Sequence, residues 1–122
     1  MKMSELGYEG VQPPVDGYAP GGFRIGGRFA EGAVLLSPRG LARLETAELE
    51  TLPLAHLTAL APEVDVLLVG TGPDIRTLPA PLADALTAAG IGVEAMSSPS
   101  ACRTYNVLLS EGRRVAAAIL PV

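Results

Sequence analysis

Apolar and polar positions alternate in blocks through the second half of the chain. Residues 64–69 (VDVLLV) form a short apolar run of the kind found in strands that are covered on both faces, and the run ends at Gly70. Apolar residues then recur at helical spacing, at Leu78, Leu82, Leu86 and Ala89. This pattern predicts a strand followed by an amphipathic helix, which Gly90 would end in a left-handed conformation.

The same alternation continues towards the C-terminus. Residues 91–96 (IGVEAM) predict a second strand, and residues 97–99 (SSP) supply a serine cap and a first-turn proline for a further helix. The apolar face of that helix is expected at Ala101, Tyr105, Leu108 and Leu109. The helix is predicted to end at Gly112, and residues 115–120 (VAAAIL) to form another strand. The order β-α-β-α-β predicts parallel pairing through right-handed crossovers, at least for the first two of these strands.

Glycine and proline divide the first half of the chain at short intervals, which is typical of short strands joined by turns. Phe23–Ile25 and Arg28–Phe29 flank the pair Gly26-Gly27, and two glycines accept the positive φ angles of a type I′ hairpin turn. A second turn is predicted between Ala33–Leu36 and Leu41–Leu44. Short antiparallel strands are therefore expected here.

Length and composition are those of one domain. The chain has 122 residues, of which 48% are apolar and 4% are aromatic, so we expect one core built from leucine, valine, isoleucine and alanine. Residues 53–61 (PLAHLTALA) add a short predicted helix. We expect a single α/β domain over residues 15–122, preceded by a flexible arm over residues 1–14, which show no periodicity.

Charge and residue counts disfavour several classes of function. Thirteen acidic against nine basic residues give a net charge of −4, which opposes binding to nucleic acid. One cysteine and one histidine cannot assemble a usual zinc site, and one cysteine cannot form an internal disulfide. The first ten residues lack a signal-peptide pattern, and no apolar run has the length of a membrane span. We expect a cytoplasmic protein without a metal, a cofactor, a nucleic-acid partner or a membrane span.

The best candidate site is the edge where the predicted parallel strands end. Ligands of open α/β sheets usually bind at this edge, and the N-terminus of the last helix would offer N–H groups and a dipole that favour an anion there. The candidate ligand-binding residues are Gly70, Thr71, Gly72, Ser97, Ser98, Ser100, Cys102, Arg103 and Asn106. A structural interpretation competes, because strand-to-helix turns need glycine, serine and proline for turning and capping alone. A dinucleotide-binding Gly-x-Gly-x-x-Gly motif would need glycine where Ile75 stands, so no NAD site is predicted.

Several polar residues have two interpretations. Cys102, beside Arg103 in the first turn of a helix, is either a reactive thiol or a small packed residue, and packing is favoured because no catalytic partner is identifiable. Arg103 either pairs with an anion or is solvated. His56 is interpreted as a surface residue. Glu94 is interpreted as a charge that protects an edge strand rather than as a buried acid. Asn106 is polar and mid-helix, and is a candidate to hydrogen-bond a loop.

Three segments resemble a known family: residues 19–23 (APGGF), residues 67–72 (LLVGTG) and the long run of residues 90–121. The chain resembles the Mth-type domains of unknown function, a family that includes the mitochondrial complex I assembly factor three and the adipogenesis-associated Mth-domain protein. The resemblance implies an α/β fold with a mixed central β-sheet, helices packed on it and an additional N-terminal β layer. It implies no established enzyme activity, and the mitochondrial relative has a protein-binding role in assembling NADH:ubiquinone oxidoreductase.

Two classes of function stay open. The first is a non-enzymatic accessory or assembly-type factor that binds a protein partner, by analogy with the complex I assembly factor. The alternative is a protein or enzyme that binds a small anion or ligand at Thr71 and residues 97–103. An exposed apolar patch near Phe23 or Phe29 would favour the first, and a deep pocket the second. Relatives often carry an aspartate and a threonine where this chain has Ser97-Ser98, and no carboxylate pair or serine–histidine pair is apparent. We therefore assign no catalytic residue and do not expect an enzyme.

Overall fold

A five-stranded mixed sheet forms the middle layer of the computed structural model, which describes residues 12–122. Its strands are β4 (Val34–Ser37), β5 (Gly40–Arg43), β6 (Val66–Gly70), β7 (Gly92–Met96) and β8 (Val115–Ile119). Their spatial order is β5-β4-β8-β6-β7. β6 pairs in parallel with β7 and β8, whereas β4 pairs antiparallel with β5 and β8. The predicted mixed sheet and the parallel pairing of β6 with β7 are confirmed.

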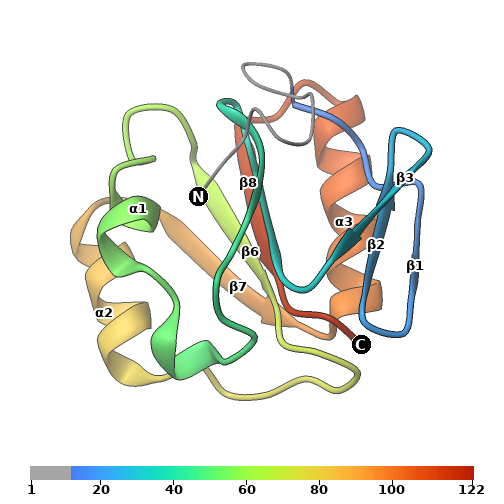
Figure 1. The fold of residues 1–122 in the computed structure, drawn as a ribbon. Coiled ribbons are helices and arrows are strands. Elements are labelled where there is room, and N and C mark those ends of the chain that lie inside the picture. Colours follow the sequence, from blue (N-terminus) through green and yellow to red (C-terminus); the bar gives the residue numbers. More distant parts are fainter. Residues whose placement is uncertain (1–11) are drawn as a thin grey trace.

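Helices cover the sheet on both faces (Figure 1). They are α1 (Leu54–Thr58), α2 (Ala80–Ala88) and α3 (Ser98–Ser110). The chain passes from β6 through α2 to β7, and then from β7 through α3 back across β6 to β8. These crossovers travel in opposite directions, and right-handed crossovers of opposite direction place their helices on opposite faces of a sheet. Accordingly α2 packs on one face together with α1, and α3 packs on the other.

The strands of the middle layer divide their side chains between two cores, because alternate residues of a strand point to opposite faces. In β6, Leu67 and Val69 join the core under α1 and α2, whereas Leu68 joins the core under α3. All five residues of β8 are buried and divide in the same way. The apolar run of residues 64–69 predicts a strand covered on both faces, and the structure confirms such a strand at Val66–Gly70, two residues later than the run begins.

A three-stranded antiparallel sheet lies beside α3 in the third layer, on the right in Figure 1. Its strands are β1 (Gly17–Ala19), β2 (Gly22–Ile25) and β3 (Arg28–Glu31). Ile25 pairs with Arg28 across Gly26 and Gly27, whose φ angles are 61° and 79°, so the predicted hairpin is present. Phe23 and Ile25 point into the core under α3. The N-terminal β layer that the resemblance implied is confirmed, although the three-residue strand β1 was not predicted.

The segment between β5 and β6 differs from the prediction in detail. A short 3-10 helix, η2 (Leu49–Thr51), precedes α1 and was not predicted. The predicted helix at residues 53–61 is shorter in the structure, where it ends at Thr58 and is followed by turns. Pro62 explains this early end, because proline has no N–H to donate and disfavours helical geometry in the residue before it.

The helix caps near the C-terminus follow the prediction closely. Gly90 and Gly112 have φ angles of 84° and 75°, in the left-handed region that ends a helix. α3 begins one residue earlier than expected, with Ser97 as N-cap and Pro99 in the second helical position. The earlier start follows from hydrogen bonding, because Ser97 accepts from the helix while the hydroxyl of Ser98 is used elsewhere.

The predicted N-terminal arm falls mostly outside the described part of the chain, since its residues 1–11 are not described. Among residues 12–122, no helix is long and apolar enough to cross a membrane. The same residues contain no group of three or more histidine, cysteine, aspartate or glutamate side chains placed to hold a metal ion.

Candidate functional site

Ser98 lies at the centre of the predicted strand-end site. Its hydroxyl accepts a hydrogen bond from the Gly72 N–H (2.9 Å) and donates one to the Leu120 carbonyl (2.6 Å). Its own N–H donates to the Gly72 carbonyl (2.7 Å), and the residue is fully buried. One residue at the start of α3 therefore bonds to the loop after β6 and to the end of β8. We call Gly70, Thr71, Gly72, Ser98 and Leu120 the strand-end network.

Gly70 allows α3 to approach the sheet closely. A Cβ at this position would lie 2.7 Å from Cγ2 of Ile119, 3.0 Å from the Ser98 hydroxyl and 3.1 Å from Cβ of Ala101. The Gly70 carbonyl also accepts a hydrogen bond from the Leu120 N–H (2.9 Å). Close packing therefore explains why glycine is at this position, since any side chain would push the helix or the neighbouring strand away.

Thr71 fixes the conformation of the loop at residues 72–79. Its hydroxyl donates to the Asp74 carbonyl (2.7 Å) and accepts from the Arg76 N–H (3.0 Å). The guanidinium of Arg76 in turn forms a 3.0 Å ion pair with Glu50, in η2. The buried Thr71 hydroxyl and the ion pair between Arg76 and Glu50 therefore both stabilise the conformation of the loop.

The first turn of α3 uses its N–H groups within the chain. The Ser98 N–H belongs to the strand-end network, Pro99 has no N–H, and the Ser100 N–H donates to the Ser97 hydroxyl (3.4 Å). Arg103 is exposed and donates to the Ser100 hydroxyl (3.2 Å). Within residues 12–122, these three positions leave no free N–H for an anion, and anion binding at this edge stays a prediction.

Cys102 packs among apolar side chains on the buried face of α3. Burial raises the pKa of the Cys102 thiol to about 11, although the neighbouring Arg103 guanidinium acts in the opposite direction. At neutral pH the side chain is therefore a thiol rather than a thiolate nucleophile. The interpretation of Cys102 as a packed residue is confirmed.

Asn106 holds the segment that leads into β1. Its side-chain oxygen accepts from the Val15 N–H and its amide nitrogen donates to the Val15 carbonyl, both at 2.8 Å. The preceding residue, Tyr105, donates its buried hydroxyl to the Pro13 carbonyl (2.7 Å), and burial raises the pKa of Tyr105. The predicted hydrogen bond from Asn106 to a loop is confirmed. Asn106 lies about two helical turns from Ser98, so the structure does not bring it to the strand-end network.

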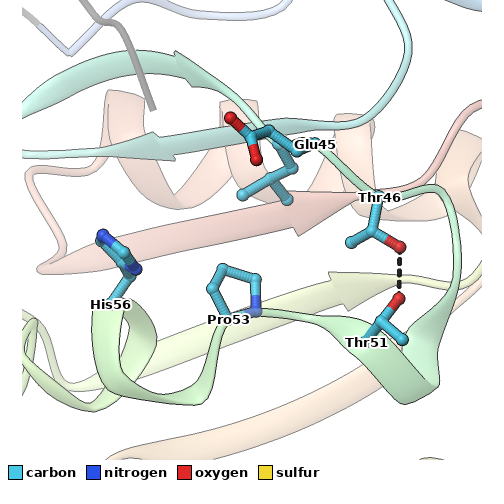
Figure 2. A pocket seen from close by; sticks show the side chains of 6 residues that line it. Glu45, Thr46, Thr51, Pro53 and His56 are labelled. Carbon is cyan, nitrogen blue, oxygen red and sulfur yellow. Dashed lines mark hydrogen bonds between the residues drawn. The ribbon is translucent and has the colours of Figure 1, made fainter.

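A pocket of about 190 Å³ has none of the predicted ligand-binding residues in its lining (Figure 2). It is lined by Leu44, Glu45, Thr46, Thr51, Pro53 and His56. The hydroxyls of Thr46 and Thr51 bond to each other, and Figure 2 marks no other hydrogen bond among the six residues. His56 is exposed, as predicted, but its place at a pocket was not predicted. The lining residues come from residues 44–56, which show no apolar period. The only sequence feature that could have indicated a polar pocket here is the run ETAELET at residues 45–51.

Two of the exposed large apolar side chains among residues 12–122 lie on the three-stranded sheet: Tyr18, which pairs with Phe23, and Phe29. Phe23 is fully buried, and Phe29 is 47% exposed with its ring lying over Gly22, where an added Cβ would be 2.8 Å from the ring. The most exposed large apolar side chain among residues 12–122 is Ile75, at 68%. It lies between the two loop residues that bond to Thr71.

Comparisons of sequence place these features among known proteins. A family model described as "Protein of unknown function (DUF498/DUF598)" matches residues 15–120. An uncharacterised protein of Rhodobacter capsulatus is 48% identical over 122 residues, which cover 100% of this chain and 94% of the relative. A protein of Danio rerio named NADH dehydrogenase (ubiquinone) 1 alpha subcomplex assembly factor 3 is 36% identical over 109 residues, which cover 85% of this chain. The chain spans only 62% of that assembly factor's length.

Solved structures share the arrangement of layers. A structure described as an outer membrane protein from Bartonella henselae has a TM-score of 0.84 and 32% identity, covering 91% of this chain and 96% of that one. A Mth938-like domain from Bordetella pertussis has a TM-score of 0.74 and 29% identity, covering 89% of this chain and 85% of that one. The likeness extends over most of each chain.

Proposed function

The chain belongs to the DUF498/DUF598 family of Mth-type domains of unknown function, and from this membership we propose that it is a non-enzymatic accessory factor that binds a protein partner. The relative in Danio rerio is named as an assembly factor of an NADH dehydrogenase subcomplex. We assign the partner of this chain to the same class, a subunit or assembly intermediate of a respiratory NADH dehydrogenase. The predicted cytoplasmic location is part of this proposal.

The main structural support for the proposal is the exposed position of Ile75 on an ordered loop. This side chain is 68% exposed at the carboxyl end of the sheet, on a loop that two hydrogen bonds to the Thr71 hydroxyl hold in place. The ion pair between Arg76 and Glu50 links the loop to η2. An exposed aliphatic side chain is unremarkable on a loose loop, but here the backbone on both sides of it is fixed.

A fixed loop favours binding to a protein for an entropic reason. Ordering a flexible segment upon association opposes binding, whereas a segment that is already ordered loses little conformational freedom. The energy of protein interfaces is concentrated in a few apolar or aromatic side chains that become fully covered, surrounded by polar residues. Ile75 is a single exposed aliphatic side chain whose neighbours in the sequence, Asp74 and Arg76, are polar. We call residues 72–79 the Ile75 loop.

Deletion of the Rhodobacter capsulatus relative tests the proposal, because that protein is 48% identical over the whole of this chain. We expect the deletion strain to contain less assembled NADH dehydrogenase, measured by activity staining of native gels of its membranes. Expression of the present chain should restore the assembled enzyme. Normal assembly in the deletion strain, at normal levels of the other respiratory complexes, would count against an assembly role.

A further inference from the structure

We propose that the pocket at residues 44–56 binds an ammonium group carried on a short methylene chain. The pocket is about 190 Å³ in volume and opens beside α1, between the end of β5 and the start of that helix (Figure 2). This volume is below the usual range for sites of drug-sized ligands, and it suits a short chain with one polar head. The inference is independent of the proposed accessory function.

The apolar part of the lining fits a methylene chain. Leu44 is only 7% exposed and continues into the core under α1 and α2, and the Pro53 ring forms another part of the wall. Long cationic side chains and alkyl amines cover apolar surface with their methylene groups while the charged head stays near water. A partly open pocket with these two residues in its wall offers that combination.

The polar part of the lining offers acceptors. The Thr46 and Thr51 hydroxyls are occupied by their mutual hydrogen bond, and the Thr46 hydroxyl also accepts from the Glu48 N–H (3.1 Å). The Glu45 carboxylate, by contrast, forms no hydrogen bond with the other lining residues in Figure 2. A carboxylate accepts hydrogen bonds only, and an ammonium group donates three. The Glu45 carboxylate, which has no hydrogen-bond partner among the lining residues, therefore matches a primary ammonium head.

The charges around the pocket also favour a cationic ligand. The segment that forms its wall carries Glu45, Glu48 and Glu50, and the nearby cation Arg76 is already paired with Glu50. An anion would be repelled by the Glu45 carboxylate in the lining and by Glu48 three residues further along the chain, whereas a cation would be attracted by them. The whole chain carries a net charge of −4, which adds to this preference.

An ammonium group on a methylene chain has two possible sources, a free alkyl amine or the lysine side chain of another protein. We would titrate ¹⁵N-labelled protein with n-butylammonium, with Nα-acetyl-lysine N-methylamide, and with Nα-acetyl-norleucine N-methylamide as a neutral isostere. We expect both cations to shift the amide resonances of residues 44–56, and the norleucine compound to shift them far less. Tighter binding of the lysine compound would assign the site to protein side chains, and tighter binding of butylammonium would assign it to free amines.

Glu45→Gln keeps the shape of the pocket and removes its charge. Because Glu45 is exposed, the variant should fold, as unchanged resonances elsewhere would show. We expect roughly two- to five-fold weaker binding of both cations, the range of a partly exposed ion pair. The matched control is Glu48→Gln, which removes the same charge from a residue outside the pocket lining and should change affinity less. No shift at residues 44–56, equal shifts with norleucine, or equal losses in the two variants would overturn the proposal.

Discussion

Hydrogen bonds from single side chains connect α3 to the neighbouring segments at two places, Ser98 and Asn106. Ser98 bonds to the loop after β6 and to the end of β8, and Gly70 leaves the space in which its hydroxyl lies. Asn106 connects α3 to Val15, far away in sequence, through both of its side-chain polar groups. At this scale a change of one or two atoms is expected to have a measurable effect on stability.

Gly70→Ala should destabilise the protein through overpacking. The new methyl would lie 2.7 Å from Cγ2 of the fully buried Ile119, too close for an undistorted contact, so the helix or the strand would have to shift. We expect a loss of about 1–3 kcal/mol in the free energy of unfolding, measured by urea denaturation. Gly17→Ala is the matched control, because nothing lies within 4 Å of its added Cβ, and it should change stability by less than about 0.5 kcal/mol. Equal losses in the two variants would show that Gly70 has no packing role.

Asn106→Ala should release the segment that leads into β1. The substitution leaves the Val15 N–H and carbonyl without their partners, and we expect it to cost about 1–3 kcal/mol. The direct measurement is hydrogen exchange of the Val15 amide, which should become faster in the variant. Thr104→Ala, in the same helix, is the control. Unchanged exchange at Val15 in Asn106→Ala would contradict the role given to this side chain.

At the scale of elements, the apolar face of α2 can be tested at Leu86. This residue is fully buried in the core under α1 and α2. Leu86→Ala removes the Cγ methine and both Cδ methyls from that core and should destabilise the protein by about 2–5 kcal/mol. Thr87→Ala, at the exposed neighbouring position, should change the free energy of unfolding by less than about 0.5 kcal/mol. A loss below about 1 kcal/mol for Leu86→Ala would mean that another face of α2 is buried.

Elements with a regular apolar period or a glycine turn signal could be predicted from the sequence, and elements with neither could not. The leucines of α2 and the apolar run of β6 each carry a complete local signal, so their existence and order follow from the chain alone. The strand β1 has only three residues and the helix η2 is a single turn, so neither contains a full period. Their positions depend on contacts with distant segments, such as the pairing of Tyr18 with Phe23.

At the candidate site, the contacts that follow from the order of elements could be predicted, and those that depend on the direction of a side chain could not. The order β-α-β-α-β brings the loop after β6 beside the start of α3, and Gly72 and Ser98 are indeed hydrogen-bonded. The sequence does not reveal whether a serine hydroxyl points to solvent or to another strand, so the contact of Ser98 with Leu120 was not predictable. The pocket beside α1 depends on how an aperiodic loop folds over Leu44, which no local pattern encodes.

At the scale of the whole molecule, two surface features lie close together. The Ile75 loop and the segment that lines the pocket are connected by the ion pair between Arg76 and Glu50, and Thr51 of the pocket follows Glu50 directly. The middle sheet positions both features, since Thr71 follows β6 and Leu44 follows β5. This end of the molecule therefore combines a fixed apolar side chain with an acidic pocket.

The most direct test of the account is the amount of assembled NADH dehydrogenase in the Rhodobacter capsulatus deletion strain when it is complemented with Ile75→Asp. The matched control is Val107→Asp on α3, which places the same charge at another exposed aliphatic side chain, 54% exposed against 68% for Ile75. With both variants present at the level of the wild-type chain, we expect Ile75→Asp to restore on the order of one tenth of the enzyme that the wild type restores, because a charge in the centre of an interface is strongly unfavourable. Val107→Asp should restore nearly all of it. Full restoration by Ile75→Asp, or an equal loss with both variants, would contradict the claim that the Ile75 loop binds the partner.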